Sequence, residues 1–169
     1  FDQRKRAYHI SKNQLYSNTP SDFDFKLAQN SLFLNRKSLL KLLKSTSIVF
    51  LAMHGPFGED GQIQTFLEKN NIPFIGSGSK ACKMAFDKYK ANEILQDKGF
   101  FTLPSSLLKI YAKDNIKIIK KFFQNYKIKH AIVKPATGGS SIGVFSVKTP
   151  EEAIEKMNII FSKRMDTRV

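Results

Sequence analysis

Apolar residues in this chain gather in short runs between polar, glycine- or proline-containing turns, and the spacing within each run predicts an element. Residues Ile48–Met53 (IVFLAM) form a continuous apolar run, the pattern of a strand buried on both faces of a parallel sheet. After the polar loop His54–Gly61 comes a predicted helix with Ile63 and Leu67 on one face, and then a short strand at Ile72–Ile75. This order of strand, loop, helix and strand indicates an open α/β sheet, in which ligands bind beyond the carboxyl ends of the strands.

Residues 1–30 carry weaker signals. Short strands are predicted at Ala7–Ile10 and Gln14–Tyr16, and Ser17–Ser21 (SNTPS) has the composition of a loop. Leu32–Leu43 has apolar positions compatible with a short helix.

Helix start and stop signals are clearer in the second half. Ser79–Lys98 is predicted to be helical with a break near Asp87, and Gly99 stands where a helix commonly ends. Thr149–Glu152 (TPEE) has the pattern of a capping box with proline at the first helical position, so a helix is expected from there to about Lys163.

A further helix is expected over Ile116–Tyr126, with Asp114 as its cap. Its buried face is predicted to contain Ile119, Phe122, Phe123 and Tyr126. Near Val169 another apolar strand is expected to begin.

Composition narrows the classes of function. The formal charge of +14 raises the question of nucleic-acid binding, but 23 of the 28 basic residues are lysines spread along the whole chain rather than gathered in a stripe. One cysteine, Cys82, gives neither an internal disulfide nor a cysteine metal cluster. No apolar run approaches the ~18 residues of a membrane span and no cleavable leader is recognised, so a soluble, cytoplasmic protein without membrane partners is expected.

The segment at residues 130–147 (HAIVKPATGGSSIGVFSV) points to phosphate chemistry. An apolar run ends in Lys134, a Gly/Ser loop follows, and a second apolar run closes the segment. Because the lysine precedes the glycines and a strand follows them, a Walker-type P-loop is excluded and a hairpin that folds over a triphosphate is predicted. Gly138 and Gly139 allow close approach of the backbone, and two serine hydroxyls add donors. The alternative is an ordinary mobile hairpin tip with a solvated lysine.

Three blocks in series carry a family resemblance: HGPFGEDGQIQTFLE at 54–68, IPFIGSGSKACKMAFDKYKANEIL at 72–95 and IVKPATGGSSIGV at 132–144. Together they resemble the D-alanine–D-alanine ligase family of ATP-grasp enzymes. The resemblance implies an α/β fold: residues 1–85 as part of a parallel-sheet, Rossmann-like, substrate-binding N-terminal domain, and 86–169 as the α+β central ATP-grasp subdomain. It implies an internal fragment that lacks the family's N-terminal start and C-terminal domain.

The resemblance also assigns roles to residues. Lys88 and Lys134 match the two lysines that bind ATP phosphates, and His54 and Glu59 match positions that line the first D-alanine subsite. Ser140 matches a loop serine that helps to position that D-alanine. The expected catalytic residues are accordingly His54, Glu59 and Ser140, and the expected nucleotide-binding residues are Lys88, Lys134, Gly138, Gly139, Ser140 and Ser141.

The implied reaction joins two D-alanines through a D-alanyl phosphate for peptidoglycan synthesis, with ATP and Mg²⁺ and, for the full-length enzyme, a homodimer. No metal ligands are assigned in this chain, so Mg²⁺ ligands are expected outside it and the fragment alone is expected to be inactive. Two positions depart from the family pattern: Thr65, where a smaller residue is usual, and Gly138, where an acidic residue is common.

Three alternatives stay open at this point. The first is a D-alanine–D-lactate ligase or another ATP-grasp carboxylate–amine ligase. The second is a non-catalytic basic module that binds nucleic acid or an acidic partner. The third is a degenerate relic that folds poorly and exposes an unpaired sheet edge.

Overall fold

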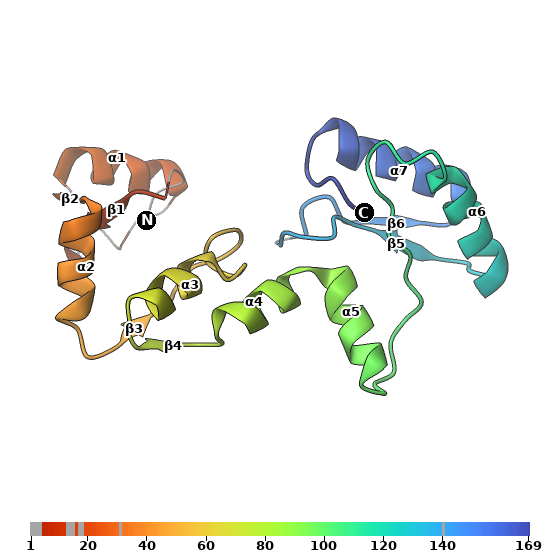
Figure 1. Ribbon diagram of the computed structural model, residues 1–169. Helices are drawn as coiled ribbons and strands as arrows, with labels where there is room; N and C mark the ends of the chain where they lie inside the picture. Colours follow the sequence, from red (N-terminus) through yellow and green to blue (C-terminus); the bar gives the residue numbers. More distant parts are fainter. Residues whose placement is uncertain (1–4, 13–15, 17–18, 31, 140) are drawn as a thin grey trace. The chain divides into compact units, whose positions relative to one another are not determined.

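The computed structural model describes residues 5–12, 16, 19–30, 32–139 and 141–169. The chain divides into two compact units. The first contains the described residues up to Leu51 together with Thr65–Gly76, and the second contains Ala52–Gln64 together with Ser77–Val169. In Figure 1 the first unit is mostly red to yellow and the second mostly green to blue.

The first unit begins with an antiparallel strand pair. Strand β1 (Ala7–His9) pairs with β2 (Leu32–Leu34), with Ala7 opposite Leu34, which confirms the strand predicted near Ala7. The helix predicted at Leu32–Leu43 is wrong in its first part, because three of those residues form β2 and helix α2 (Arg36–Lys44) begins after them. Asn35 separates β2 from α2. Its backbone is extended, and its side chain caps the helix by accepting a hydrogen bond from the Ser38 N–H at 2.9 Å.

Helix α1 (Pro20–Asn30) begins inside the segment predicted as a loop and continues through residues for which no element was predicted. The loop predicted for Ser17–Ser21 is wrong at its end, since Pro20 opens the helix and Thr19 Oγ1 accepts from the Asp22 N–H at 3.1 Å. Residues 17 and 18 lie outside the described residues, as do two of the three residues of the predicted strand Gln14–Tyr16; Tyr16 itself is not in a strand.

A parallel strand pair completes the first unit. Strand β3 (Val49–Phe50) pairs with β4 (Phe74–Ile75), which confirms the parallel connection predicted from the sequence. Helix α3 (Gln62–Lys69) lies between them in the sequence. The predicted burial of the Ile48–Met53 run on both faces is wrong, since Phe50 is 71% exposed. Among the described residues β3 has β4 as its one strand neighbour, so no second strand covers it.

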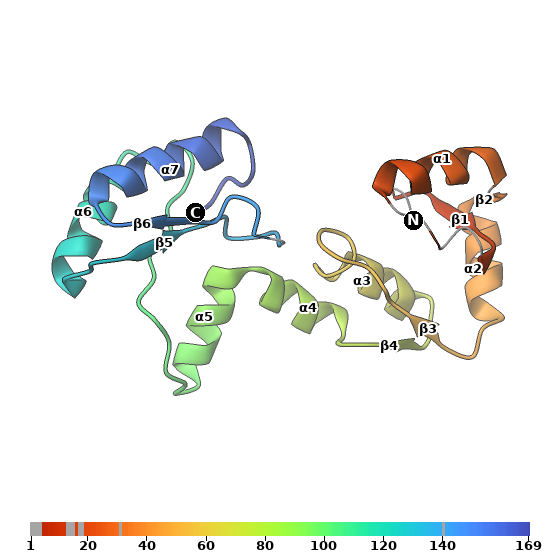
Figure 2. The ribbon, with the colours of Figure 1, turned by 180° about the vertical axis from the view of Figure 1, so that it is seen from behind.

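The second unit combines an antiparallel hairpin with helices. Its remaining elements are α4 (Ser79–Phe86), α5 (Lys88–Asp97), α6 (Asn115–Tyr126), β5 (Ala131–Val133), β6 (Phe145–Val147) and α7 (Pro150–Ser162). Strands β5 and β6 pair with Ile132 opposite Ser146, as the predicted hairpin requires. Helix α7 lies along this hairpin in both views (Figure 1, Figure 2).

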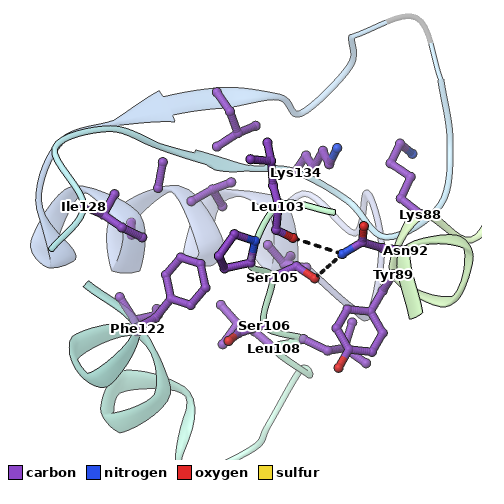
Figure 3. Close-up of a pocket in the computed structure, with 18 of the residues that line it drawn as sticks. Lys88, Tyr89, Asn92, Leu103, Ser105, Ser106, Leu108, Phe122, Ile128 and Lys134 are labelled. Atoms are coloured by element: carbon purple, nitrogen blue, oxygen red, sulfur yellow. Dashed lines mark hydrogen bonds between the residues drawn. The ribbon is translucent and has the colours of Figure 1, made fainter. Parts of the chain in front are cut away.

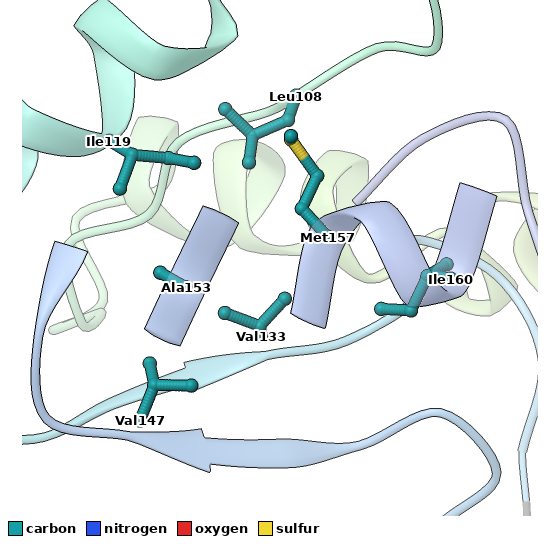
Figure 4. Packing of buried hydrophobic residues seen from close by; sticks show 7 residues of the cluster. All are labelled: Leu108, Ile119, Val133, Val147, Ala153, Met157 and Ile160. Atoms are coloured by element: carbon teal, nitrogen blue, oxygen red, sulfur yellow. The ribbon is translucent and has the colours of Figure 1, made fainter. Parts of the chain in front are cut away.

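The core of this unit lies between the hairpin and its helices (Figure 4). Alternation along β5 and β6 turns Val133 and Val147 inward, where they meet apolar residues of α7. The cluster consists of Leu108, Ile119, Val133, Val147, Ala153, Met157 and Ile160. Val147 and Ile160 are fully buried, so the hairpin that carries the glycine-rich loop is anchored in the core of this unit.

Most predicted helix ends are confirmed. Asp87 divides α4 from α5 and caps α5 by accepting from the Lys90 N–H at 3.1 Å. Gly99 follows the C-cap of α5 with φ +82°, a conformation that glycine adopts without strain. Thr149 caps α7, its Oγ1 accepting from the Glu152 N–H at 3.2 Å.

Helix α6 (Asn115–Tyr126) confirms the predicted bounds to within one residue, but its expected cap and one expected buried residue are wrong. Asp114 occupies the N-cap position but its side chain makes no capping hydrogen bond. The Asn115 side chain instead donates to the Lys109 carbonyl at 2.7 Å and accepts from the Lys109 N–H at 3.2 Å. Tyr126, predicted to be buried, is 54% exposed because α6 ends at that residue.

Where the sequence predicted a strand to begin near Val169, the structure has an isolated antiparallel bridge between Lys109 and Arg168. The Leu108 N–H donates to the Val169 carbonyl at 2.7 Å and the Val169 N–H donates back at 2.9 Å. The Ala136 N–H donates to the Arg168 carbonyl at 3.0 Å, which joins this pair to the residues that follow β5. The helices are short, α7 being 13 residues long, and no described helix is long and apolar enough to cross a membrane.

Candidate functional site

The second unit contains a cavity of about 860 Å³. Its walls come from α5, α6, β5 and the irregular segment at residues 101–108, and most of the lining is apolar (Figure 3). Lys88 and Lys134 both line it, and Figure 3 shows their side chains at the same end. The cavity therefore combines two cations at one end with apolar walls.

Local structure explains how the two lysines reach this cavity. Lys134 directly follows β5, in which Val133 faces the core while Ile132 is 58% exposed. Alternation of side chains places Lys134 on the same open face as Ile132. Lys88 is the first residue of α5, directly after the capping residue Asp87. Two residues 46 positions apart in the sequence thus meet at one cavity.

The root of the glycine-rich loop, defined here as Ala136–Gly138, is bonded to Lys88. The Lys88 N–H donates to the Ala136 carbonyl at 2.9 Å, and the Lys88 ammonium donates to the Gly138 carbonyl at 2.8 Å. Gly138 has φ +99° and Ser141 has φ +58°, so both residues have positive φ, which glycine adopts more readily than serine. Ser140, an expected catalytic and nucleotide-binding residue, lies outside the described residues.

The charge of Lys88 is affected by its surroundings. Partial burial, together with the nearby ammonium of Lys134, lowers the pKa of Lys88 below its ordinary value. The carboxylates of Asp166 and Asp87 oppose this change and raise it. An anion bound between the two ammonium groups would offset the repulsion that lowers the pKa of Lys88.

One wall of the cavity depends on a residue that sequence reasoning missed. The Asn92 amide donates to the Leu103 carbonyl at 3.2 Å and to Ser105 Oγ at 2.9 Å, as the dashed lines in Figure 3 show. These bonds fix the irregular segment against α5. No local pattern in the sequence marks an asparagine whose partners are 11 and 13 residues away.

The expected substrate residues His54 and Glu59 lie in the same loop, between β3 and α3. Glu59 Oε2 accepts from the Gly55 N–H at 2.6 Å, and Glu59 Oε1 is 3.8 Å from His54 Nδ1. The His54 side chain is 97% exposed. Asp60 Oδ1 accepts from the N–H of Gln62, the first residue of α3, at 3.0 Å. His54 and Glu59 are not among the described residues that line the cavity.

Known proteins are similar to this chain in sequence and in fold. A family profile described as the D-ala D-ala ligase N-terminus matches residues 2–77. A D-alanine–D-alanine ligase of Enterococcus faecalis is 37% identical over 134 residues, which is 79% of this chain and 38% of that protein. The structure of the D-alanine–D-alanine ligase from Coxiella burnetii superposes with a TM-score of 0.78 at 23% identity, covering 96% of this chain and 49% of that one. The chain belongs to the D-alanine–D-alanine ligase family.

Its relation to longer D-alanine–D-alanine ligases is partial. The chain spans less than half the length of the curated relatives it matches. The structure of the Bacillus anthracis D-alanine–D-alanine ligase complexed with ATP superposes with a TM-score of 0.65 at 28% identity, over 79% of this chain and 42% of that one. The α/β first unit and the second unit with its glycine-rich hairpin therefore have the fold of the ATP-grasp ligases.

The described residues of this family member contain no group of three or more histidine, cysteine or carboxylate side chains that could hold a metal ion. Asp166 and Asp87 near Lys88 are already engaged with Thr137 and Arg168 respectively. The donor set that Mg²⁺ prefers is thus not assembled from the residues seen here.

Proposed function

We propose that this chain is the first-substrate and nucleotide portion of an ATP-dependent carbon–nitrogen ligase that forms D-alanyl-D-alanine for peptidoglycan synthesis. Residues 1–85 would serve as the substrate-binding part and residues 86–169 as the central ATP-grasp part. One observation carries the proposal: Lys88 and Lys134, from distant parts of the sequence, line one end of a single cavity, and Lys88 is hydrogen-bonded to the root of the glycine-rich loop.

The chemistry explains why two cations are needed. In the proposed reaction a D-alanine carboxylate attacks the γ-phosphorus of ATP, ADP leaves, and the amine of a second D-alanine displaces phosphate from the D-alanyl phosphate. As the bond to ADP breaks, negative charge moves from the attacking carboxylate to the bridging oxygen that leaves with ADP, and in the second step it moves onto the released phosphate. Ammonium groups that are already in place stabilise that charge without reorganising.

Each part of the site has a proposed task. Lys88 and Lys134 bind phosphate oxygens, and the Lys88 ammonium exchanges its bond to the Gly138 carbonyl for one to phosphate. Backbone donors from Gly138 to Ser141, including Ser140, close over the phosphates. The apolar walls exclude water, which strengthens these charged contacts and protects the acyl phosphate from hydrolysis.

His54 and Glu59 are proposed to line the first D-alanine subsite. Glu59 holds the loop through the Gly55 N–H, which leaves the exposed His54 imidazole available to a substrate. Mg²⁺ would take its ligands from residues other than those described. The full-length enzyme is proposed to be a cytoplasmic homodimer that uses ATP and D-alanine and binds no nucleic acid.

Nucleotide titration tests the proposal. The chain is titrated calorimetrically with Mg²⁺ and an ATP analogue that carries an imido group between the β- and γ-phosphates. We expect saturable binding that Lys134→Ala abolishes and Lys163→Ala preserves, since Lys163 is exposed at the end of α7 and does not line the cavity. Equal affinity in the two variants would refute the nucleotide site.

An oligonucleotide titration at two salt concentrations separates the rival reading of a basic module. Such a module would bind the oligonucleotide with affinity that falls steeply as salt rises, through release of counterions. We expect weak binding that the analogue does not compete for. Tight binding of oligonucleotide together with no binding of the analogue would favour the module.

A coupled assay of ADP release tests the expected inactivity of the chain by itself. With ATP, Mg²⁺ and D-alanine we expect no turnover, because the described residues assemble no metal-binding carboxylate set. Turnover by these 169 residues would show that the chain supplies a complete catalytic site.

A further inference from the structure

We propose that Asp166 and Arg168 are positioning residues of the nucleotide site: they touch no phosphate, but they hold the loop root and the start of α5 so that Lys88 and Lys134 face the same anion. This inference rests on the proposed function. It adds two residues from the C-terminal segment that neither the sequence patterns nor the family resemblance singled out.

Asp166 holds the loop root. Its Oδ2 accepts from both the N–H and the hydroxyl of Thr137, each at 2.8 Å. Its Oδ1 accepts from the N–H groups of Thr167 and Arg168 at 2.7 and 3.1 Å. Both oxygens are therefore used, and the carboxylate joins its own segment to a residue 29 positions earlier.

Arg168 holds the start of α5. Its guanidinium Nη1 donates to Asp87 Oδ2 at 2.6 Å, and the Asp87 side chain is only 8% exposed. The other oxygen of Asp87 accepts from the Lys90 N–H, so the ion pair acts directly on the first turn of the helix that begins with Lys88. The Arg168 carbonyl also accepts from the Ala136 N–H at 3.0 Å.

The contacts of Asp166 and those of Arg168 both affect the position of Lys88. Its backbone N–H and its ammonium both donate to the loop root, which Asp166 and the Arg168 carbonyl hold from the other side. If the contacts made by Asp166 or by Arg168 shift, Lys88 moves relative to Lys134. Since charge-assisted hydrogen bonds depend strongly on geometry, such a shift weakens contact with a shared phosphate.

Electrostatics distinguishes this role from ordinary fold stabilisation. Burial and the Lys134 ammonium lower the pKa of Lys88, while the carboxylates of Asp166 and Asp87 raise it; Arg168 neutralises Asp87 from the C-terminal segment. Replacing Asp166 by asparagine removes one of the charges that keep Lys88 protonated. The pKa of Lys88 then falls further, and nucleotide affinity is lost at a lower pH than in the unchanged chain.

The test is a titration with the imido ATP analogue and Mg²⁺ from about pH 7 to about pH 10, the range over which a lysine of lowered pKa deprotonates. We expect Asp166→Asn to bind about tenfold more weakly at neutral pH, the effect of losing one hydrogen bond to a charged group, and to lose affinity at lower pH. The matched control is Asp97→Asn, an exposed carboxylate at the end of α5. It should keep the wild-type affinity and pH profile.

Conservative pairs support the same test. Arg168→Lys should retain most of the affinity because it keeps a cation for Asp87, whereas Arg168→Met should lose about tenfold. Thr137→Ser should bind like the unchanged chain and Thr137→Val should not. The Thr137 pair also decides the matter if Asp166→Asn fails to fold.

Two results would overturn the inference while leaving the proposed function intact. One is an Asp166→Asn or Thr137→Val variant that binds the analogue as the unchanged chain does. The other is a loss that is equal at every pH and matches a loss of folded protein in thermal unfolding. Failure of the unchanged chain to bind, or full binding by Lys134→Ala, would instead refute the proposed function itself.

Discussion

The loop root at Ala136–Gly138 and the loop His54–Gly61 are both turns of the second unit, but they are held in different ways. Hydrogen bonds to the loop root and its neighbour Lys88 come from partners 29 to 50 residues away, and the adjoining ion pair of Asp87 spans 81. The bonds described in the His54 loop span two to six residues. Bonds from distant parts of the sequence therefore hold the loop root, whereas the bonds described in the His54 loop are local.

The largest expected effect of this difference is on nucleotide affinity. Lys88→Met should weaken binding of the imido ATP analogue about ten- to a hundredfold, because it removes one charged hydrogen bond to phosphate. His54→Ala should leave that affinity unchanged, since its side chain is exposed and lies outside the cavity lining. Calorimetric titration of both variants measures the difference in affinity. A similar loss in both would contradict the proposal that Lys88 binds the nucleotide and His54 does not.

The free energy of unfolding should likewise depend more on the long-range bonds at the loop root than on the local bonds of the His54 loop. Arg168→Met leaves the buried Asp87 carboxylate without its guanidinium partner and should lower the free energy of unfolding by about 1.5–3 kcal/mol. Glu59→Gln changes an exposed local bond and should alter it by less than about 0.5 kcal/mol. Urea denaturation at neutral pH compares the two. Equal effects would mean that the distant bonds are no stronger than the local ones.

A glycine pair sharpens the comparison further. Gly143 and Gly55 both have positive φ, but a Cβ at Gly143 would lie 2.9 Å from Met165 Sδ and 3.0 Å from Pro135 Cγ, whereas one at Gly55 has nothing within 4 Å. Gly55→Ala should cost about 1 kcal/mol for the backbone conformation alone, and Gly143→Ala about 1 kcal/mol more for the crowding. Thermal and urea unfolding should separate them, and identical losses would indicate that Met165 moves aside freely.

Acid should reduce the stability difference between the unchanged chain and Arg168→Met. Burial alone would raise the pKa of Asp87, but the Lys90 N–H and the Arg168 guanidinium outweigh it and lower that pKa below 3.8. The stabilisation from this depressed pKa is present above the unfolded value and is lost as pH falls through the folded value. The gap in stability between the unchanged chain and Arg168→Met should therefore shrink below about pH 3.8, and a gap that persists there would argue against an ionic origin.

The sequence predicted best what short-range chemistry decides. The break at Asp87, the stop at Gly99 and the cap at Thr149 each depend on a residue bonding its own neighbours, so their types are visible in the pattern. Leu32–Leu34 was assigned to a helix because three apolar residues fit one helical turn as well as a strand. Its pairing with Ala7–His9 is decided by tertiary contact.

In the candidate site, too, the sequence pattern revealed only residues that a local pattern marks. Lys134 was visible because it stands between an apolar run and a glycine-rich loop, whereas Lys88 stood out only through the family resemblance among 23 lysines. Asn92, Asp166 and Arg168 were not visible, because their partners are 11 to 81 residues away and no local spacing marks them. Predictions for Ser140 concern a residue outside those the structure describes.

The most direct test of the central claim is affinity labelling with an adenosine polyphosphate that carries a pyridoxal group on its terminal phosphate. The aldehyde forms an imine with any lysine beside the phosphates, borohydride fixes the imine, and peptide mapping identifies the lysine. The account predicts labelling of Lys88 and Lys134 that ATP prevents, with the other lysines labelled only weakly and without protection. Protected labelling at lysines outside this cavity, with Lys88 and Lys134 unmodified, would contradict it.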